Sequence, residues 1–258
     1  ARNTDSFIYE SLDSGISWRR IAELHGQIWS NLFIHNGDLY IMGTDHCDRY
    51  GGRLNGRVVI RRSRDGGETW TEPKDEYSGL LLDQDGYHTA AVPVVVHNGR
   101  VWRAMEFAPE PERMTWTAGV MSAPEDADLL RRDSWTMSEQ VSHLWSSSQW
   151  IEGNVVVDRN GNVVDILRTN WRGKDELVKS EARDQAVILT VSENGISLSF
   201  DRENDIIRFP GAGTKFTIRY DSASELYWTL SNKQTHPDAR RNRLYLSSSP
   251  DLRKWRVR

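Results

Sequence analysis

The residues best suited to chemistry lie on either side of one dipeptide, Asn160-Gly161, which is typical of a tight β-hairpin turn. Counting outward from this turn along the two strands that it should join, we expect Glu152 to face Arg168 or its neighbour. A guanidinium beside a carboxylate keeps the carboxylate ionised, and the other N–H groups of the arginine remain available for an anionic ligand. The alternative is an ordinary salt bridge at the end of a strand.

The same counting places other polar side chains at the ends of corresponding strands. His88 and Glu106 are candidates for an acid-base or sugar-binding pair, and Asp45 ends an earlier strand. For His88, a structural histidine with satisfied hydrogen bonds is the alternative. Arg241 is a candidate for binding a carboxylate, because a planar and permanently charged guanidinium suits that group. Its basic neighbours Arg240 and Arg243 leave a solvated cluster as the alternative.

Aromatic side chains are a second group of candidate binding residues in this sequence, which holds 11 tryptophans. Trp29 and Trp150 lie near the same strand ends as the polar candidates, so we expect them to stack on sugar rings. Tryptophans that fill the space between sheets would have the same pattern.

The elements that position these residues recur along the chain. The dipeptides Asn36-Gly37, Asn98-Gly99 and Asn160-Gly161 follow one another at equal intervals and predict three hairpins. A second turn interleaves with them and occurs twice in full, as Ser11, Asp13, Gly15 and Trp18 and as Ser63, Asp65, Gly67 and Trp70. In such a turn the aspartate accepts backbone N–H groups, the glycine adopts positive φ and the tryptophan packs between sheets, so these eight residues are structural.

Two hairpins per repeat give four antiparallel strands per unit, which is the pattern of a β-propeller blade. We expect one all-β propeller domain over residues 1–258, built from a half unit at 1–25 and units at 26–75, 86–140, 149–202 and 213–258. That makes about 4.5 blades of a five- or six-bladed ring. Open blade edges are unfavourable, so we also expect the ring to continue beyond one or both ends.

The repeated Ser-x-Asp-x-Gly-x-x-Trp turn resembles the Asp box of sialidase-type (BNR-repeat) propellers, and the whole pattern resembles bacterial glycan-degrading members of that family. The segment from Trp150 to Arg168 also resembles sialidases, in which a Glu opens the inner strand and an Arg closes the hairpin. The resemblance implies that Glu152 deprotonates a nucleophilic Tyr and that Arg168 and Arg241 hold the carboxylate of the sugar. The Tyr nucleophile and the acidic Asp of that family have no counterpart in these 258 residues.

Composition and absent motifs exclude several classes of protein. No apolar run approaches the ~20 residues that span a bilayer, and a net charge of -4 gives no basic excess for nucleic acid. The single Cys47 excludes an intrachain disulfide framework, and no nucleotide-binding or zinc-protease motif is present. We therefore expect no cofactor and no metal. The propeller resemblance suggests an exported protein, although no signal peptide is visible.

These observations favour a glycoside hydrolase of sialidase-like fold that acts on an anionic, carboxylate-bearing glycan. Two alternatives stay open at this point. One is a carbohydrate-binding propeller without catalysis, and the other is a propeller-type polysaccharide lyase that uses His88 and Tyr87 to remove a proton.

Overall fold

The computed structural model describes residues 4–46, 56–84, 86–110, 115–142, 148–171, 184–233, 241 and 243–258. Apart from one short 3-10 helix, η2 (Arg132–Ser134), the regular elements of these residues are β-strands, which confirms the all-β prediction. The chain divides into two compact units. The first unit holds residues 1–91, 110–114 and 126–135, and the second holds residues 92–109, 115–125 and 136–258.

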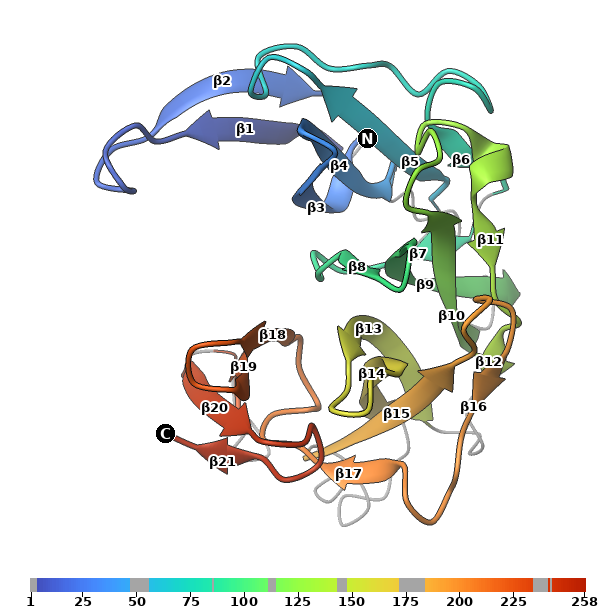
Figure 1. Cartoon of the computed structure of the whole chain (residues 1–258), viewed down its shortest axis with the longest axis vertical. Coiled ribbons are helices and arrows are strands. Elements are labelled where there is room, and N and C mark those ends of the chain that lie inside the picture. The colour runs from blue at the N-terminus through green and yellow to red at the C-terminus, as the bar shows by residue number, and fades with distance from the viewer. Residues whose placement is uncertain are drawn as a thin grey trace. The chain divides into compact units, whose positions relative to one another are not determined.

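The first unit contains a two-stranded sheet and a four-stranded antiparallel sheet (Figure 1). The two-stranded sheet pairs β1 (Ser6–Glu10) with β2 (Arg19–Leu24). The four-stranded sheet has the sequential order β3 (Ile28–His35), β4 (Asp38–Thr44), β5 (Val58–Ser63) and β6 (Leu80–Leu82). Its last strand lies beyond residue 75, where the sequence analysis ended this unit. The short strand β7 (Tyr87–His88) follows.

The second unit contains strands of three further sheets (Figure 1). In one of them β10 lies between β9 and β11, while β8 pairs with β9 and β12 pairs with β10. The bounds of these strands are β8 (Val95–His97), β9 (Arg100–Glu110), β10 (Thr115–Pro124), β11 (Thr136–Met137) and β12 (Val141–Ser142).

The other two sheets of the second unit also follow chain order. One consists of β13 (Ser148–Val157), β14 (Val163–Trp171), β15 (Gln185–Val191) and β16 (Leu198–Ser199), with β17 (Ile206–Arg208) also paired to β15. The last consists of β18 (Thr217–Asp221), β19 (Leu226–Ser231), β20 (Tyr245–Ser249) and β21 (Arg256–Val257).

The β13–β17 sheet is buried on both faces, which explains its continuous apolar runs. Successive side chains of a strand point to opposite faces. Val163 and Leu167 of β14 accordingly join the core that also holds Trp102 of β9, whereas Val164 and Ile166 join the core that holds Ile218 of β18. A sheet that packs against a neighbour on each face is the arrangement expected of a propeller blade.

The hairpin dipeptides form two kinds of turn. Asn36-Gly37 and Asn98-Gly99 are two-residue turns with positive φ at both positions, because His35 pairs with Asp38 and His97 with Arg100. At the third dipeptide only Gly161 has positive φ, and the loop runs from residue 158 to residue 162. There the Asp158 carboxylate accepts the N–H groups of Asn160 and Asn162, each at 2.8 Å, which stabilises the longer turn.

The two full Ser-x-Asp-x-Gly-x-x-Trp turns share one set of hydrogen bonds. In the second copy, Ser63 Oγ accepts the Gly67 N–H at 2.8 Å, Asp65 accepts the Thr69 N–H at 2.9 Å, and the Trp70 indole donates to the Gly67 carbonyl at 2.8 Å. The first copy repeats these bonds around Asp13.

The two tryptophans of these turns differ in packing. Trp70 lies against a buried cluster that includes Ile8 and Ile41, as expected for a residue between sheets. Trp18 is 62% exposed, so the prediction that it packs between sheets is wrong. The hydrogen bonds within the turn are therefore sufficient to form it without burial of the indole.

Among the described residues, the structure contains no helix of the length and apolarity needed to cross a bilayer.

Candidate active site

A β-bulge in β13 positions Glu152. Ile151 pairs with Arg168 and Asn154 pairs with Ile166, so the two residues Glu152 and Gly153 lie opposite a single residue of β14. Glu152 takes φ of +59°, in the left-handed region that few non-glycine residues adopt. Bulges and strained backbone of this kind concentrate at functional sites, because they redirect one side chain out of the regular alternation.

The Glu152 carboxylate is held between two cations. It is 4% exposed, it accepts a hydrogen bond from Arg168 Nε, and Lys215 Nζ lies 3.3 Å from Oε1. The ion pair with Arg168 is the contact that the hairpin count predicts. Arg168 also donates from NH1 to the Gly213 carbonyl at 3.2 Å, which anchors the guanidinium in the segment that precedes Lys215.

Asn154 joins the bulge to β18. Its side-chain amide donates to the Phe216 carbonyl at 3.3 Å and accepts the Ile218 N–H at 3.1 Å. Because Phe216 follows Lys215 directly, these bonds fix the backbone that carries the second cation. The lysine is a site residue that the predicted set did not contain, because its place beside Glu152 depends on contact between two sheets.

A second layer of buried charge lies under the bulge. Glu106 of β9 accepts the Gly153 N–H through Oε1 at 2.9 Å. Asp165 of β14 and Arg103 of β9 are fully buried. These two side chains interact electrostatically with each other and with Glu106. Glu106 belongs to the site predicted from the sequence, and Asp165 and Arg103 do not. The available signal was a charged residue inside an apolar run, as in the Val163–Leu167 stretch that holds Asp165.

The other predicted residues of the first unit form their own group. Trp29 lies in a bulge of β3 with φ of +47°, and its ring meets the His88 ring edge-on at 4.6 Å. Asp45 is bound to Arg57, whose Nε donates to Oδ2 at 2.7 Å, and to His46. His88 belongs to the first unit and Glu106 to the second, so their pairing stays a prediction.

Two predicted residues lie away from any such group. Trp150 is 0% exposed in the core, where its ring packs on Phe200 at 4.9 Å. No face of this indole is left for a sugar, so Trp150 is not part of the site. Arg241 is exposed. Within the described part of the chain, Arg168 is bonded to Glu152 and Gly213, so a joint role of Arg168 and Arg241 stays a prediction.

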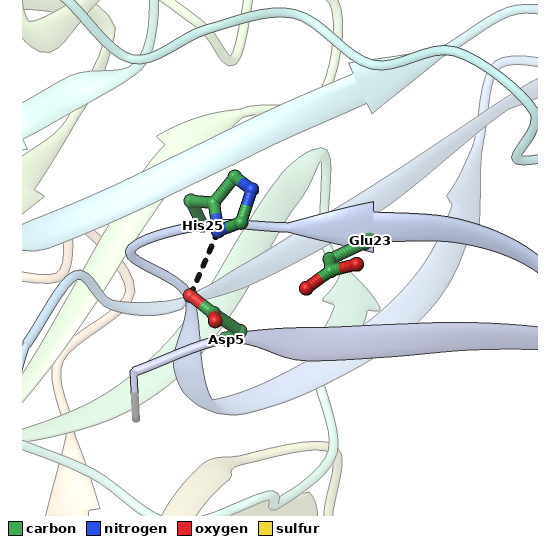
Figure 2. A group of neighbouring side chains, drawn as sticks. All are labelled: Asp5, Glu23 and His25. Carbon is green, nitrogen blue, oxygen red and sulfur yellow. Dashed lines mark hydrogen bonds and ion pairs between the residues drawn. The ribbon is translucent and has the colours of Figure 1, made fainter. Parts of the chain in front are cut away.

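One further cluster combines two carboxylates with an imidazole, at the sheet of β1 and β2 (Figure 2). His25 Nδ1 lies 3.0 Å from Asp5 Oδ1, and a Glu23 oxygen completes a group within 4.8 Å. Oxygen and imidazole ligands of this kind suit a divalent cation. Glu23 is already paired with Arg20, and His25 with Asp5, so each of these three cluster residues has a partner within the protein.

Comparison with known proteins finds similar structures but no similar sequences. No protein-family model matches the sequence, and no curated protein matches it in sequence. Solved structures match over most of the chain. A β-1,3-galactosidase of family GH43, solved with galactodeoxynojirimycin, has a TM-score of 0.59 at 12% identity and covers 91% of this chain and 76% of its own.

Two other similar structures are also glycosidases by name. An α-L-arabinofuranosidase of Clostridium thermocellum has a TM-score of 0.55 at 11% identity, covering 89% of this chain and 70% of its own. An α-L-arabinanase of Penicillium chrysogenum, solved with arabinobiose, has a TM-score of 0.55 at 15% identity, covering 97% and 72%. The fold is therefore an all-β propeller of the five-bladed GH43 type.

The sialidase-type assignment from the sequence is wrong, because the fold matches solved structures of GH43 glycosidases. The physical reason lies in the turn that carried the resemblance. Its hydrogen bonds close within a few residues, so it stabilises a hairpin in propellers of different families and does not identify one of them.

Proposed function

We propose that this chain is a glycoside hydrolase of the GH43 propeller type and that Glu152 is a catalytic residue. The observation that carries the proposal is the bulge, which turns a carboxylate out of strand alternation and holds it between Arg168 and Lys215. An ordinary salt bridge at a strand end needs neither a left-handed backbone nor a second cation.

The two cations assign a role to Glu152. Nearby positive charge favours the ionised form of a carboxylate, and an ionised carboxylate can accept a proton or attack an anomeric carbon. Glycosidases pair such a group with a carboxylic acid that protonates the leaving oxygen. We therefore propose that Glu152 acts as the base or nucleophile and not as the acid.

The contacts of Arg168 favour a neutral sugar as the substrate. Its guanidinium is buried and engaged by Glu152 and by the Gly213 carbonyl, which weakens the case for a clamp on a sugar carboxylate. The similar structures named above carry galactose- or arabinose-type names. A galactoside or arabinoside is therefore proposed in place of an anionic glycan.

The test compares the wild-type protein with Glu152→Gln on paired substrates. Each pair consists of a nitrophenyl glycoside and a disaccharide of the same sugar, for galactose and for arabinose. A residue that acts as base or nucleophile is needed for both substrates, so the variant should lose about 10²–10⁴-fold of the rate on each. A variant that keeps its rate on the nitrophenyl glycoside alone would make Glu152 the acid.

The same screen separates the other functions. Glycan binding without product from the wild-type protein would indicate a carbohydrate-binding propeller. An unsaturated product that absorbs in the near ultraviolet would indicate a lyase. Wild-type turnover by Glu152→Gln would reduce the ion pair to a structural role.

A further inference from the structure

The layer beneath Glu152 contains two carboxyl groups and one guanidinium, all removed from solvent. Glu106 is 1% exposed, while Asp165 and Arg103 are 0% exposed. Asp165 points to the same face of β14 as Val163 and Leu167, which belong to the core shared with β9. Burial of a charged carboxylate in this core is unfavourable in free energy unless the carboxylate is paired and hydrogen-bonded.

Both carboxyl groups meet at Gly153. Glu106 Oε1 accepts the Gly153 N–H at 2.9 Å, and a Cβ atom added to Gly153 would lie 2.3 Å from Asp165 Oδ1 and 2.5 Å from Oδ2. The Asp165 oxygens therefore occupy the space that any side chain at residue 153 would need. Glycine at this position and the carboxyl group behind it fit one another.

The hydrogen bonds distinguish the two carboxyl groups. Glu106 accepts the N–H of Gly153. Neither oxygen of Asp165 has a hydrogen-bond partner within the described part of the chain. The charged groups that face Asp165 are Glu106 and Arg103 of β9, whereas β15 presents its pairing partner Leu189 and β13 presents Gly153 and Val155.

The surroundings of Asp165 favour the neutral form of its carboxyl group. A carboxylate without a hydrogen-bond donor in this core would be strongly unfavourable. Burial first, and then the charge of Glu106, raise the pKa of Asp165 well above its usual value, while Arg103 opposes this shift.

We propose that Asp165 keeps its proton at neutral pH and that this neutral carboxylic acid is a positioning residue for Glu152, acting through its contact with Gly153. The protonation state of Asp165 rests on the buried layer alone. Its effect on turnover rests also on the function proposed above.

The first experiment measures unfolding by urea across pH for the wild-type protein and for Asp165→Asn, which has the same shape and no proton to lose. The raised pKa means that stability is fully present below the ordinary Asp value of 3.8 and declines as pH rises toward the folded-state value. The wild-type protein should therefore lose stability relative to Asp165→Asn as pH increases, and the variant should be the more stable of the two at pH 8.

Infrared spectroscopy supplies an independent readout. The wild-type protein at pH 7 should show the carbonyl band of a protonated carboxylic acid that is absent from Asp165→Asn. Parallel stability profiles, or an Asp165→Asn protein that is less stable than wild type at pH 7 or fails to fold, would show that Asp165 is the ionised partner of Arg103 and would overturn the proposal.

The link to Glu152 is tested by turnover. The wild-type kcat should fall at alkaline pH, where Asp165 loses its proton, and this fall should be absent from the pH profile of Asp165→Asn, which has no proton to lose. An unchanged alkaline limb would contradict the positioning role. If neither protein has glycosidase activity, the stability and infrared results still decide the state of Asp165, so the two proposals fail separately.

Discussion

Trp29 and Glu152 occupy the same position of the same bulge in two different sheets. Each follows an isoleucine that still pairs with its partner strand, and pairing resumes two residues later at an asparagine, Asn31 or Asn154. Both residues have left-handed φ, +47° and +59°. The repeat therefore preserves a backbone device that redirects one side chain, and uses it for an aromatic ring in one unit and for a carboxylate in the other.

The fit between Gly153 and Asp165 predicts a steric effect. Gly153→Ala would place Cβ against both oxygens of a fully buried carboxyl group, so we expect a loss of about 1–3 kcal/mol in the free energy of unfolding. Gly119→Ala is the matched control, because the nearest atom there is the sulfur of flexible Met137 at 3.3 Å. Urea denaturation of both variants checks this prediction, and equal losses would contradict it.

Stability should respond unequally to the same substitution in the two copies of the repeated turn. Ser63→Ala removes the acceptor of the Gly67 N–H in a turn whose tryptophan packs on a buried cluster, and we expect a loss of about 1–2 kcal/mol. Ser11→Ala removes the equivalent bond beside the exposed Trp18, and should have a smaller effect. Thermal denaturation of both variants measures the two losses of stability, and a larger loss in Ser11→Ala than in Ser63→Ala would contradict the prediction.

Acid should weaken both turns. Hydrogen bonds, first from the Ser17 side chain, lower the pKa of Asp13 from 3.8 to about 2, and those from Thr69 lower the pKa of Asp65. A lowered folded-state pKa contributes stability above the ordinary value, and this contribution is lost as pH falls through the folded-state value. The free energy of unfolding should thus fall between about pH 4 and pH 2, less steeply in Asp65→Asn. Equal slopes in the two proteins would refute this.

Substitution of the two candidate tryptophans should change different properties, the stability of the fold for Trp150 and the binding of glycan for Trp29. Trp150→Ala removes a fully buried indole from the core and should lower the free energy of unfolding by about 3–5 kcal/mol. Trp29→Ala removes a half-buried ring and should weaken glycan binding with a smaller loss of stability. Calorimetric titration with the best substrate, beside urea denaturation, measures both effects. Unchanged affinity in Trp29→Ala would exclude that ring as a sugar platform.

The sequence predicted the parts of this structure that depend on neighbours in the chain. Asn36-Gly37 and Asn98-Gly99 predicted tight hairpins, and counting from Asn160-Gly161 predicted the contact between Glu152 and Arg168. The bulge in β13 makes Ile151 the pairing partner of Arg168, and the predicted contact is made by the side chain of the adjacent Glu152.

Features that depend on packing between sheets could not be predicted. The bulge shows in the sequence only as Gly153, and the carboxyl group that fills the space beside this glycine comes from another strand. Lys215 lies just before β18 and contacts Glu152, which belongs to a different sheet. Arg103 and Asp165 also belong to different sheets, so they interact only once these sheets pack together. The family was misassigned for the opposite reason, since a turn that closes on itself around Asp65 carries no information about the sheets beyond it.

The most direct test of the account is the rate of glycoside hydrolysis by Glu152→Gln relative to wild type, on galactosides and arabinosides with good and poor leaving groups. The matched control is Glu10→Gln, which breaks an exposed ion pair with Arg19 in the first unit. We predict a loss of about 10²–10⁴-fold on both kinds of leaving group for Glu152→Gln, with wild-type rates for Glu10→Gln. Hydrolysis by Glu152→Gln at the wild-type rate would contradict the central claim that this carboxylate is the catalytic residue.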